Sequence, residues 1–215
     1  GSQMVYQYGV GVEAVDASPT VVLQPADSAA TAGPVMEAAG GWSWKPTRAA
    51  AWMSEVSVTP DGAPGLVTSL RDGGERGDVL ALSSDGTPVM ITVDQTMATV
   101  QIDAALDLSE FDGSVMFVHH VQDENNFHFT ALVDGEMRQG YSEGGDLYLM
   151  DEKPYDAAGW HTYRVVGDGT HFRAYSDETL VTHGHGDAPD PGTVGIRLNG
   201  TGTVLLDYIQ VRPVR

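Results

Sequence analysis

Histidine and aromatic side chains alternate with apolar ones in residues 116–133, a pattern that could place the polar side chains together on one face of a sheet. Two runs of β-branched and aromatic residues flank the polar residues 123–126, a pattern that predicts an antiparallel hairpin with a four-residue loop. If Val121 pairs with His128, the two-residue period of a strand puts His119 and His128 together on one face. The opposite face then carries the predicted core residues Met116, Val118, Phe127, Phe129, Ala131 and Val133.

Later strands add further side chains to the set that should point away from the core. Alternation turns Phe172 and Ala174 inward, which leaves their neighbours in the strand facing outward, and it does the same around Arg197. The candidate catalytic residues are His119, His128, Arg173, Tyr175 and Arg197, and Tyr141 joins them as a candidate ligand contact. We expect these six side chains to form one patch.

These residue types suit an acidic polysaccharide. An arginine can pair bidentately with a uronate carboxylate, and a histidine or tyrosine can remove and return a proton in β-elimination. The same groups can also hold a glycan without reaction. Alternatively, the arginines pair with surface aspartates and the histidines are ordinary strand residues. The patch therefore predicts glycan contact and leaves catalysis open.

Two tryptophans, Trp42 and Trp44, share a side if their segment is extended. Aligned tryptophans can form a platform for sugar rings, which makes both candidate ligand contacts, but tryptophans at this spacing also pack into a core or a lid. The small, polar residues 25–46 around them are interpreted as a loop, a short helix near residues 35–39, or a rim that closes one end of the fold.

A second run of potential ligands is His183-Gly184-His185-Gly186-Asp187. His183, His185 and Asp187 could supply three metal ligands from one loop, and neutral imidazoles favour zinc or another transition ion. Short histidine runs in glycine-rich turns are often simply solvated, and the sequence offers no evident fourth ligand.

The charge balance limits the partners. Thirty acidic residues against eleven basic ones give a net charge of −19. Phosphate binding needs a basic surface, so nucleic acid is not expected as a partner. No apolar run approaches the roughly 20 residues that span a bilayer, so membrane insertion is not expected. Cysteine is absent, which excludes disulfides and thiolate chemistry.

Regularly spaced strands predict the architecture. Alternating apolar patterns separated by Asp-Gly and Asn-Gly turns are typical of a β-sandwich. The predicted strands cover residues 4–15, 20–23, 51–59, 66–69, 79–82, 89–93, 97–106, 136–141, 147–150, 160–166, 171–176, 179–182, 193–198 and 203–211, besides the hairpin. We expect one domain over residues 4–215, with residues 1–3 a tag remnant. Secreted, surface, virion and intracellular locations all fit this sequence.

Three segments resemble a known superfamily. GWHTYRVVGDGTHFRAYSDETLV at 159–181 resembles a strand pair of concanavalin A-like lectin/glucanase domains. PGTVGIRLNG at 191–200 and VLLDYIQVRP at 204–213 are similar to later strands of family 16 glycoside hydrolases and their laminin G-like relatives. The resemblance covers roughly residues 97–213. It implies a jelly-roll sandwich of two antiparallel sheets, whose concave face usually holds the ligand.

Enzymatic signatures of that superfamily are missing. Family 16 hydrolases carry an E-x-D-x-x-E strand that supplies two closely spaced carboxylates. Glu110 and Asp112 come closest, but no second glutamate follows in register. The R-T/S-E-L-R and Y-F-K-A-G signatures of alginate lyases are also absent. A retaining glycosidase is therefore not expected, and a lyase would belong to a different branch.

The resemblance also implies a cofactor. The position of Asp207 in the closing strand often helps to bind a structural calcium ion, although an aspartate there can simply cap a strand end. The leading hypothesis is a carbohydrate-recognising domain that is lectin-like or a carbohydrate-binding module. The alternatives are a lyase acting on a uronate-containing glycan and a structural or adhesion protein, such as a virion surface component.

Overall fold

The computed structural model describes residues 34–37, 40–45 and 56–214, and this part of the chain is all-β. It contains one 3₁₀ turn, η3 (Gly74–Arg76), and no helix that is long and apolar enough to cross a membrane. The strands are β1 (Val35–Met36), β2 (Trp42–Trp44), β3 (Ser57–Thr59), β4 (Leu66–Asp72), β5 (Asp78–Asp85), β6 (Val89–Met97), β7 (Val100–Asp123), β8 (Asn126–Val133), β9 (Glu136–Glu143), β10 (Asp146–Pro154), β11 (Trp160–Asp168), β12 (His171–Ser176), β13 (Thr179–His185) and β14 (Gly192–Arg212). The predicted all-β class is confirmed. The predicted strands at 4–15 and 20–23 lie outside the described residues.

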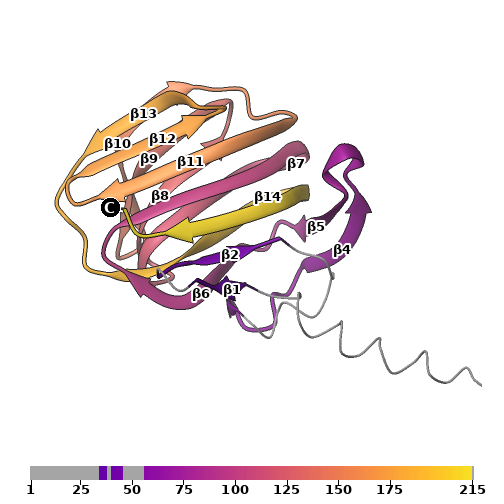
Figure 1. The fold of residues 1–215 in the computed structure, drawn as a ribbon, viewed down its shortest axis with the longest axis horizontal. Helices are drawn as coiled ribbons and strands as arrows, with labels where there is room; N and C mark the ends of the chain where they lie inside the picture. Colours follow the sequence, from indigo (N-terminus) through magenta and orange to yellow (C-terminus); the bar gives the residue numbers. More distant parts are fainter. Residues whose placement is uncertain (1–33, 38–39, 46–55, 215) are drawn as a thin grey trace, which may run out of the picture.

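The strands form two packed layers that share β7 and β14 (Figure 1). Layer A has the order β1-β2-β14-β7-β11-β12-β13, and layer B has the order β3-β6-β14-β7-β8-β9-β10. The first half of β7 pairs with β11 and its second half with β8, so β7 passes from layer A into layer B. β14 passes the other way, pairing first with β6, then with β5, and finally with β2.

Two glycines lie where β7 and β14 pass between the layers. Gly113 and Gly200 are opposite each other in the ladder. A Cβ atom on Gly113 would come within 2.5 Å of the Asn199 carbonyl oxygen, and one on Gly200 within 2.3 Å of the Asp112 carbonyl oxygen. Gly113 also has a φ of +139°. Only glycine therefore allows the two backbones to approach each other at this bend.

The main apolar core lies between the two layers. Layer A contributes residues such as Ile102 and Val165, and layer B contributes Phe117 and Leu132. Alternate residues of layer B form a second apolar cluster, which we call the outer-face cluster because it lies on the opposite face of the same strands. Its buried members are Met90, Met116, Val118, Val121, Phe127, Phe129 and Ala131, with Val133 packed against them.

The hairpin residues predicted as core thus belong to the outer-face cluster, whereas the predicted polar face points into the sandwich. This part of the prediction is wrong. Both faces of the hairpin carry apolar side chains, as Phe117 and Val118 illustrate. Alternation identifies two faces, but it does not say which of them packs on the second layer.

The hairpin of β7 and β8 forms, but the predicted pairing of Val121 with His128 is wrong. His119 pairs with His128, and the register shifts between His119 and Asp123. His120 lies within this bulge and has a φ of +52°. The bulge turns Val121 into the outer-face cluster. Alternation assumes one residue per step of the ladder, so it misses such an insertion.

Candidate functional site

A cavity of about 860 Å³, here called the end cavity, opens at one end of the sandwich. It is bounded by the ends of β8, β9 and β10 and by the segment that links β13 to β14. Its wall carries imidazole, aromatic, amide and acidic side chains. These residues are His120, Gln122, Asn126, Phe127, His128, Tyr141, Glu143, Tyr148, His185, Asp187 and Asp190. The predicted site residues His128, Tyr141, His185 and Asp187 therefore meet in one place.

Four rings form a ladder that runs from the core to the mouth of the end cavity. The His128 ring stacks on Phe172, with centroids 4.9 Å apart, and on Tyr141 at 5.6 Å. Tyr141 stacks on Tyr148 at 5.1 Å. Phe172 is only 1% exposed, whereas Tyr148 is 44% exposed. The inner rings are thus fixed by packing, and the outermost ring presents an apolar surface to a ligand.

Three imidazoles meet at the inner end of this ladder. The Nδ1 atoms of His119 and His120 are 2.7 Å apart, and His120 Nε2 lies 3.2 Å from the Ala98 carbonyl oxygen. Burial holds the pKa of His119 well below its usual value, and repulsion from the protonated forms of His120 and His128 lowers it further. Burial also lowers the pKa of His120, and it lowers that of His128 to about 4 with help from His120. All three rings are therefore neutral at neutral pH.

The wall of the end cavity is polar and acidic around the rings. Glu143, Asp187 and Asp190 supply carboxylates, while neither lysine nor arginine lines it. The His128 Nδ1 atom is buried and has no hydrogen-bond partner among the described residues. A neutral ligand with hydroxyl groups could use the carboxylates as acceptors. An anionic ligand would meet like charges.

Neither a family model nor a curated protein sequence matches this chain, but solved structures resemble it. The carbohydrate binding module CBM66 from Bacillus subtilis is 17% identical with a TM-score of 0.53, and the match covers 66% of this chain and 92% of the module. The exoplasmic/lumenal domain of VIP36, in its Ca²⁺/Man3GlcNAc-bound form, is 10% identical with a TM-score of 0.56, covering 78% and 87%. A prokaryotic β-1,3-1,4-glucanase (lichenase) from a mouse hindgut metagenome is 13% identical with a TM-score of 0.55, covering 76% and 95%.

This chain has the concanavalin A-like jelly-roll fold. The architecture implied by the segments at 159–181, 191–200 and 204–213 is thereby confirmed. At these identities the likeness establishes the fold and leaves the activity to the residues of this chain.

The jelly roll does not gather the predicted patch on one face. His119 was expected to face outward, but it is 1% exposed and lies between the layers. Arg173 and Tyr175 alternate with buried residues of β12, so they lie on the outer face of layer A. Arg197 lies on the outer face of layer B, where its guanidinium is 5.3 Å from the centroid of the Phe127 ring.

The reason is topological. The outer face of layer A and the outer face of layer B lie on opposite sides of the molecule. Alternation along one strand does not reveal to which layer the strand belongs. Of the six predicted side chains, the fold brings only His128 and Tyr141 together at the end cavity. Their role as ligand contacts remains a prediction.

The two tryptophans share a side, as expected, but that side is the main core. Trp42 and Trp44 in β2 are 1% and 4% exposed. Neither offers a face to a sugar ring, so the core interpretation is correct and the platform interpretation is wrong. Val35 and Met36 form β1 rather than a short helix, and β1 pairs with β2 at one edge of layer A.

The jelly roll splits the predicted metal run between a strand and a loop. His183 and His185 end β13 and Asp187 follows in the segment beside the end cavity. In the side-chain orientations of the structure, no three His, Cys, Asp or Glu groups of the described residues converge as metal ligands. His171 on β12, which is not part of that run, lies opposite His185 in the ladder.

Asp207 is held by two cationic side chains. It is 6% exposed, Lys45 binds its Oδ1 atom, and Arg76 Nη1 lies 3.1 Å from its Oδ2 atom. The Arg76 guanidinium also lies 4.5 Å from the centroid of the Trp160 ring. Calcium binds through several uncompensated oxygens, whereas both oxygens here already face positive charges. The residues around Asp207 therefore do not fit a calcium ion.

Replacing this carboxylate tests the ion-pair interpretation. We expect Asp207→Asn to lower the free energy of unfolding by roughly 2 kcal/mol, less than a fully buried pair would lose, because Lys45 and Arg76 can reach water. Urea unfolding with and without EDTA should give the same loss, and Asp112→Asn, at an exposed position of β7, should cost little. Destabilisation of the wild-type protein by EDTA that vanishes in Asp207→Asn would instead place a metal at this residue.

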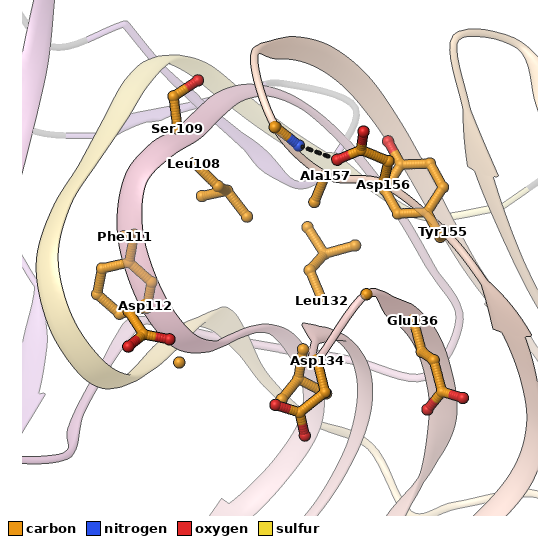
Figure 2. A pocket seen from close by; sticks show the side chains of 14 residues that line it. Leu108, Ser109, Phe111, Asp112, Leu132, Asp134, Glu136, Tyr155, Asp156 and Ala157 are labelled. Atoms are coloured by element: carbon orange, nitrogen blue, oxygen red, sulfur yellow. Dashed lines mark hydrogen bonds between the residues drawn. The ribbon is translucent and has the colours of Figure 1, made fainter.

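A second cavity, of about 340 Å³, lies between β7, β8 and the segment that follows β10 (Figure 2). Leu108, Leu132 and Ala157 project toward its interior, and Asp112 and Glu136 lie near its edge. The Asp156 carboxylate accepts a hydrogen bond from the Ala158 backbone N–H at 3.0 Å. None of the predicted site residues lines this cavity, so the end cavity is the candidate functional site.

Proposed function

We propose that this protein binds a neutral carbohydrate in the end cavity. The observation that carries the proposal is the ladder of His128, Tyr141 and Tyr148, which ends at an exposed ring beside carboxylates. Aromatic faces pack against the apolar C–H face of a sugar ring, while carboxylate and amide oxygens accept hydrogen bonds from its hydroxyls. The fold likeness to a carbohydrate binding module and to VIP36 bound to Man3GlcNAc supports this choice of ligand class.

Charge favours a neutral sugar over a uronate. Glu143, Asp187 and Asp190 give the lining a negative charge that no lysine or arginine of the lining balances. A uronate would pay for desolvation without gaining a cationic partner. We therefore expect mannose oligosaccharides or β-1,3-1,4-glucan to bind more tightly than alginate or glucuronan.

Removing the outermost ring should weaken binding. We expect Tyr148→Ala to raise the dissociation constant for the best neutral glycan by at least about tenfold, as for an exposed aromatic anchor. Tyr148 is 44% exposed, so its loss should leave the fold intact. Isothermal titration calorimetry is the measurement, and Tyr175→Ala, on the outer face of layer A, is the matched control.

Two outcomes count against this proposal. Equal weakening by both tyrosine variants would move binding away from the end cavity. No retention of the wild-type protein on any neutral or acidic glycan gel would instead favour the structural or adhesion alternative.

The lyase alternative needs an arginine beside its proton-transferring group. Arg173 and Arg197 lie on the outer faces of different layers, and neither lines the end cavity. The lyase test is incubation with alginate, ulvan and glucuronan while the absorbance of the unsaturated product is followed. We expect no rise in absorbance on any of the three substrates.

A further inference from the structure

Three imidazoles come together on the outer face of layer A. His171 on β12 pairs with His185 on β13, and His183 precedes His185 by one step on the same face. The ring centroids of His183 and His185 are 4.6 Å apart, those of His171 and His185 are 4.8 Å apart, and those of His171 and His183 are 6.2 Å apart. All three residues are exposed. We call them the histidine triad.

We propose that the histidine triad binds one divalent transition ion of the zinc class. Imidazoles that share a tetrahedral ion at Zn–N distances of about 2.0–2.1 Å have ring centroids roughly 5 Å apart. The three separations in the triad bracket that value. Imidazole is a preferred ligand of Zn²⁺, Cu²⁺ and Ni²⁺. His185 also lines the end cavity, so this site borders the proposed carbohydrate site, but its test needs no carbohydrate.

The ring nitrogens of the triad are available for such an ion. The His183 and His185 rings make no hydrogen bond or ion pair with the described residues, and the His171 ring has one contact, from Nδ1 to Thr170 Oγ1 at 3.3 Å. His161 differs, because its Nδ1 lies 2.6 Å from Asp177 Oδ2 and its Nε2 lies 3.1 Å from the Ala158 carbonyl oxygen. His161 is therefore the matched control.

Binding requires small rotations of the side chains. The rings do not converge as ligands in their present orientations, but exposed imidazoles turn freely about their side-chain torsions. Arg173, which pairs with His183 in the ladder, opposes a cation. The net charge of −19 and the nearby Asp187 attract one. Because the charge of Arg173 and the negative charges act in opposite directions, coordination by the three ring nitrogens is the interaction that decides binding.

The test is a calorimetric titration of the intact protein with ZnCl₂. We expect one Zn²⁺ per chain, and at least about tenfold weaker binding in each of His171→Gln, His183→Gln and His185→Gln. Changes to groups that only support a metal ligand already weaken binding by about 10–100-fold, so loss of a ligand itself should cost at least the lower end of that range. His161→Gln should bind like the wild type. In parallel, imidazole ¹⁵N NMR should show Zn²⁺-dependent shifts at three of the seven histidines.

Three results would overturn the assignment. The first is a wild-type protein that takes up no Zn²⁺. The second is a loss confined to the His183 and His185 variants, which would show a two-ligand contact without His171. The third is an equal loss in His161→Gln. Far-UV circular dichroism of every variant separates loss of ligand from loss of fold.

Discussion

Phe172→Ala is expected to lower the free energy of unfolding by about 3–5 kcal/mol, the usual cost of truncating a buried phenylalanine. The side chain is 1% exposed and lies between the two layers at the inner end of the ring ladder. Its ring contacts His128 at 4.9 Å and His119 at 6.1 Å between centroids. Truncation would leave a cavity beside these two imidazoles. Urea unfolding followed by tryptophan fluorescence measures the change.

Phe172→Leu is the matched control because it keeps most of the apolar volume. We expect it to cost about 1.5 kcal/mol or less. The leucine lacks the flat face on which His128 stacks, so it should still loosen the ladder and weaken glycan binding modestly. If the alanine and leucine variants were equally stable, the packing of Phe172 against the imidazoles would contribute little and the ladder would not depend on its inner end.

The fold class and most strands could be predicted because the local signals agree with the tertiary structure. Residues 171–176 alternate cleanly, and a glycine-containing turn separates them from the aromatic and β-branched residues 160–166; β12 and β11 form there. The length of β7 and β14 could not be predicted. The sequence predicts separate strands at 97–106 and 116–121, whereas the structure has one continuous strand over residues 100–123 that bends at Gly113. The Asn199-Gly200 pair resembles a hairpin turn but lies at a bend of β14.

Part of the candidate site could also be predicted. His128 and Tyr141 were identified by alternation, whereas Tyr148 and His120 were missed. Tyr148 had a usable signal, because a two-residue turn at Gly144 and Gly145 fixes the register that pairs it with Tyr141. His120 had none, since its position depends on the bulge. The assignment of Arg173 and Arg197 to different faces required the layer of each strand, which is long-range information.

Acidification should destabilise this protein between about pH 6.5 and pH 4. The lowered pKa values of His119, His120 and His128 mean that the folded state binds fewer protons than the unfolded state in this range. Their stabilising effect is complete above the unfolded pKa of about 6.5 and is lost as the pH falls toward the folded value. For His128, whose pKa is lowered to about 4, the loss amounts to roughly 3 kcal/mol. The other two imidazoles act in the same direction.

The geometry of the buried imidazoles also indicates that acidification destabilises the folded state. The 2.7 Å contact between the Nδ1 atoms of His119 and His120 needs one donor and one acceptor, so protonation of both rings would abolish it. Aspartates such as Asp123 and Asp177, whose pKa values are lowered by hydrogen bonds, add their loss only below about pH 4. The pH range in which the buried imidazoles lower stability therefore lies above the range in which protonation of carboxylates does so.

His128→Gln isolates this effect, because it removes one titrating ring while keeping a polar side chain at the cavity wall. Urea unfolding at pH 7 and at pH 4.5 should show a smaller difference in free energy for the variant than for the wild type. His171→Gln, at an exposed position outside the buried cluster, should keep the wild-type difference. A wild-type free energy of unfolding that is flat over this range, or unchanged by His128→Gln, would mean that the buried imidazoles are hydrated and that the end cavity admits water to the inner end of the ring ladder.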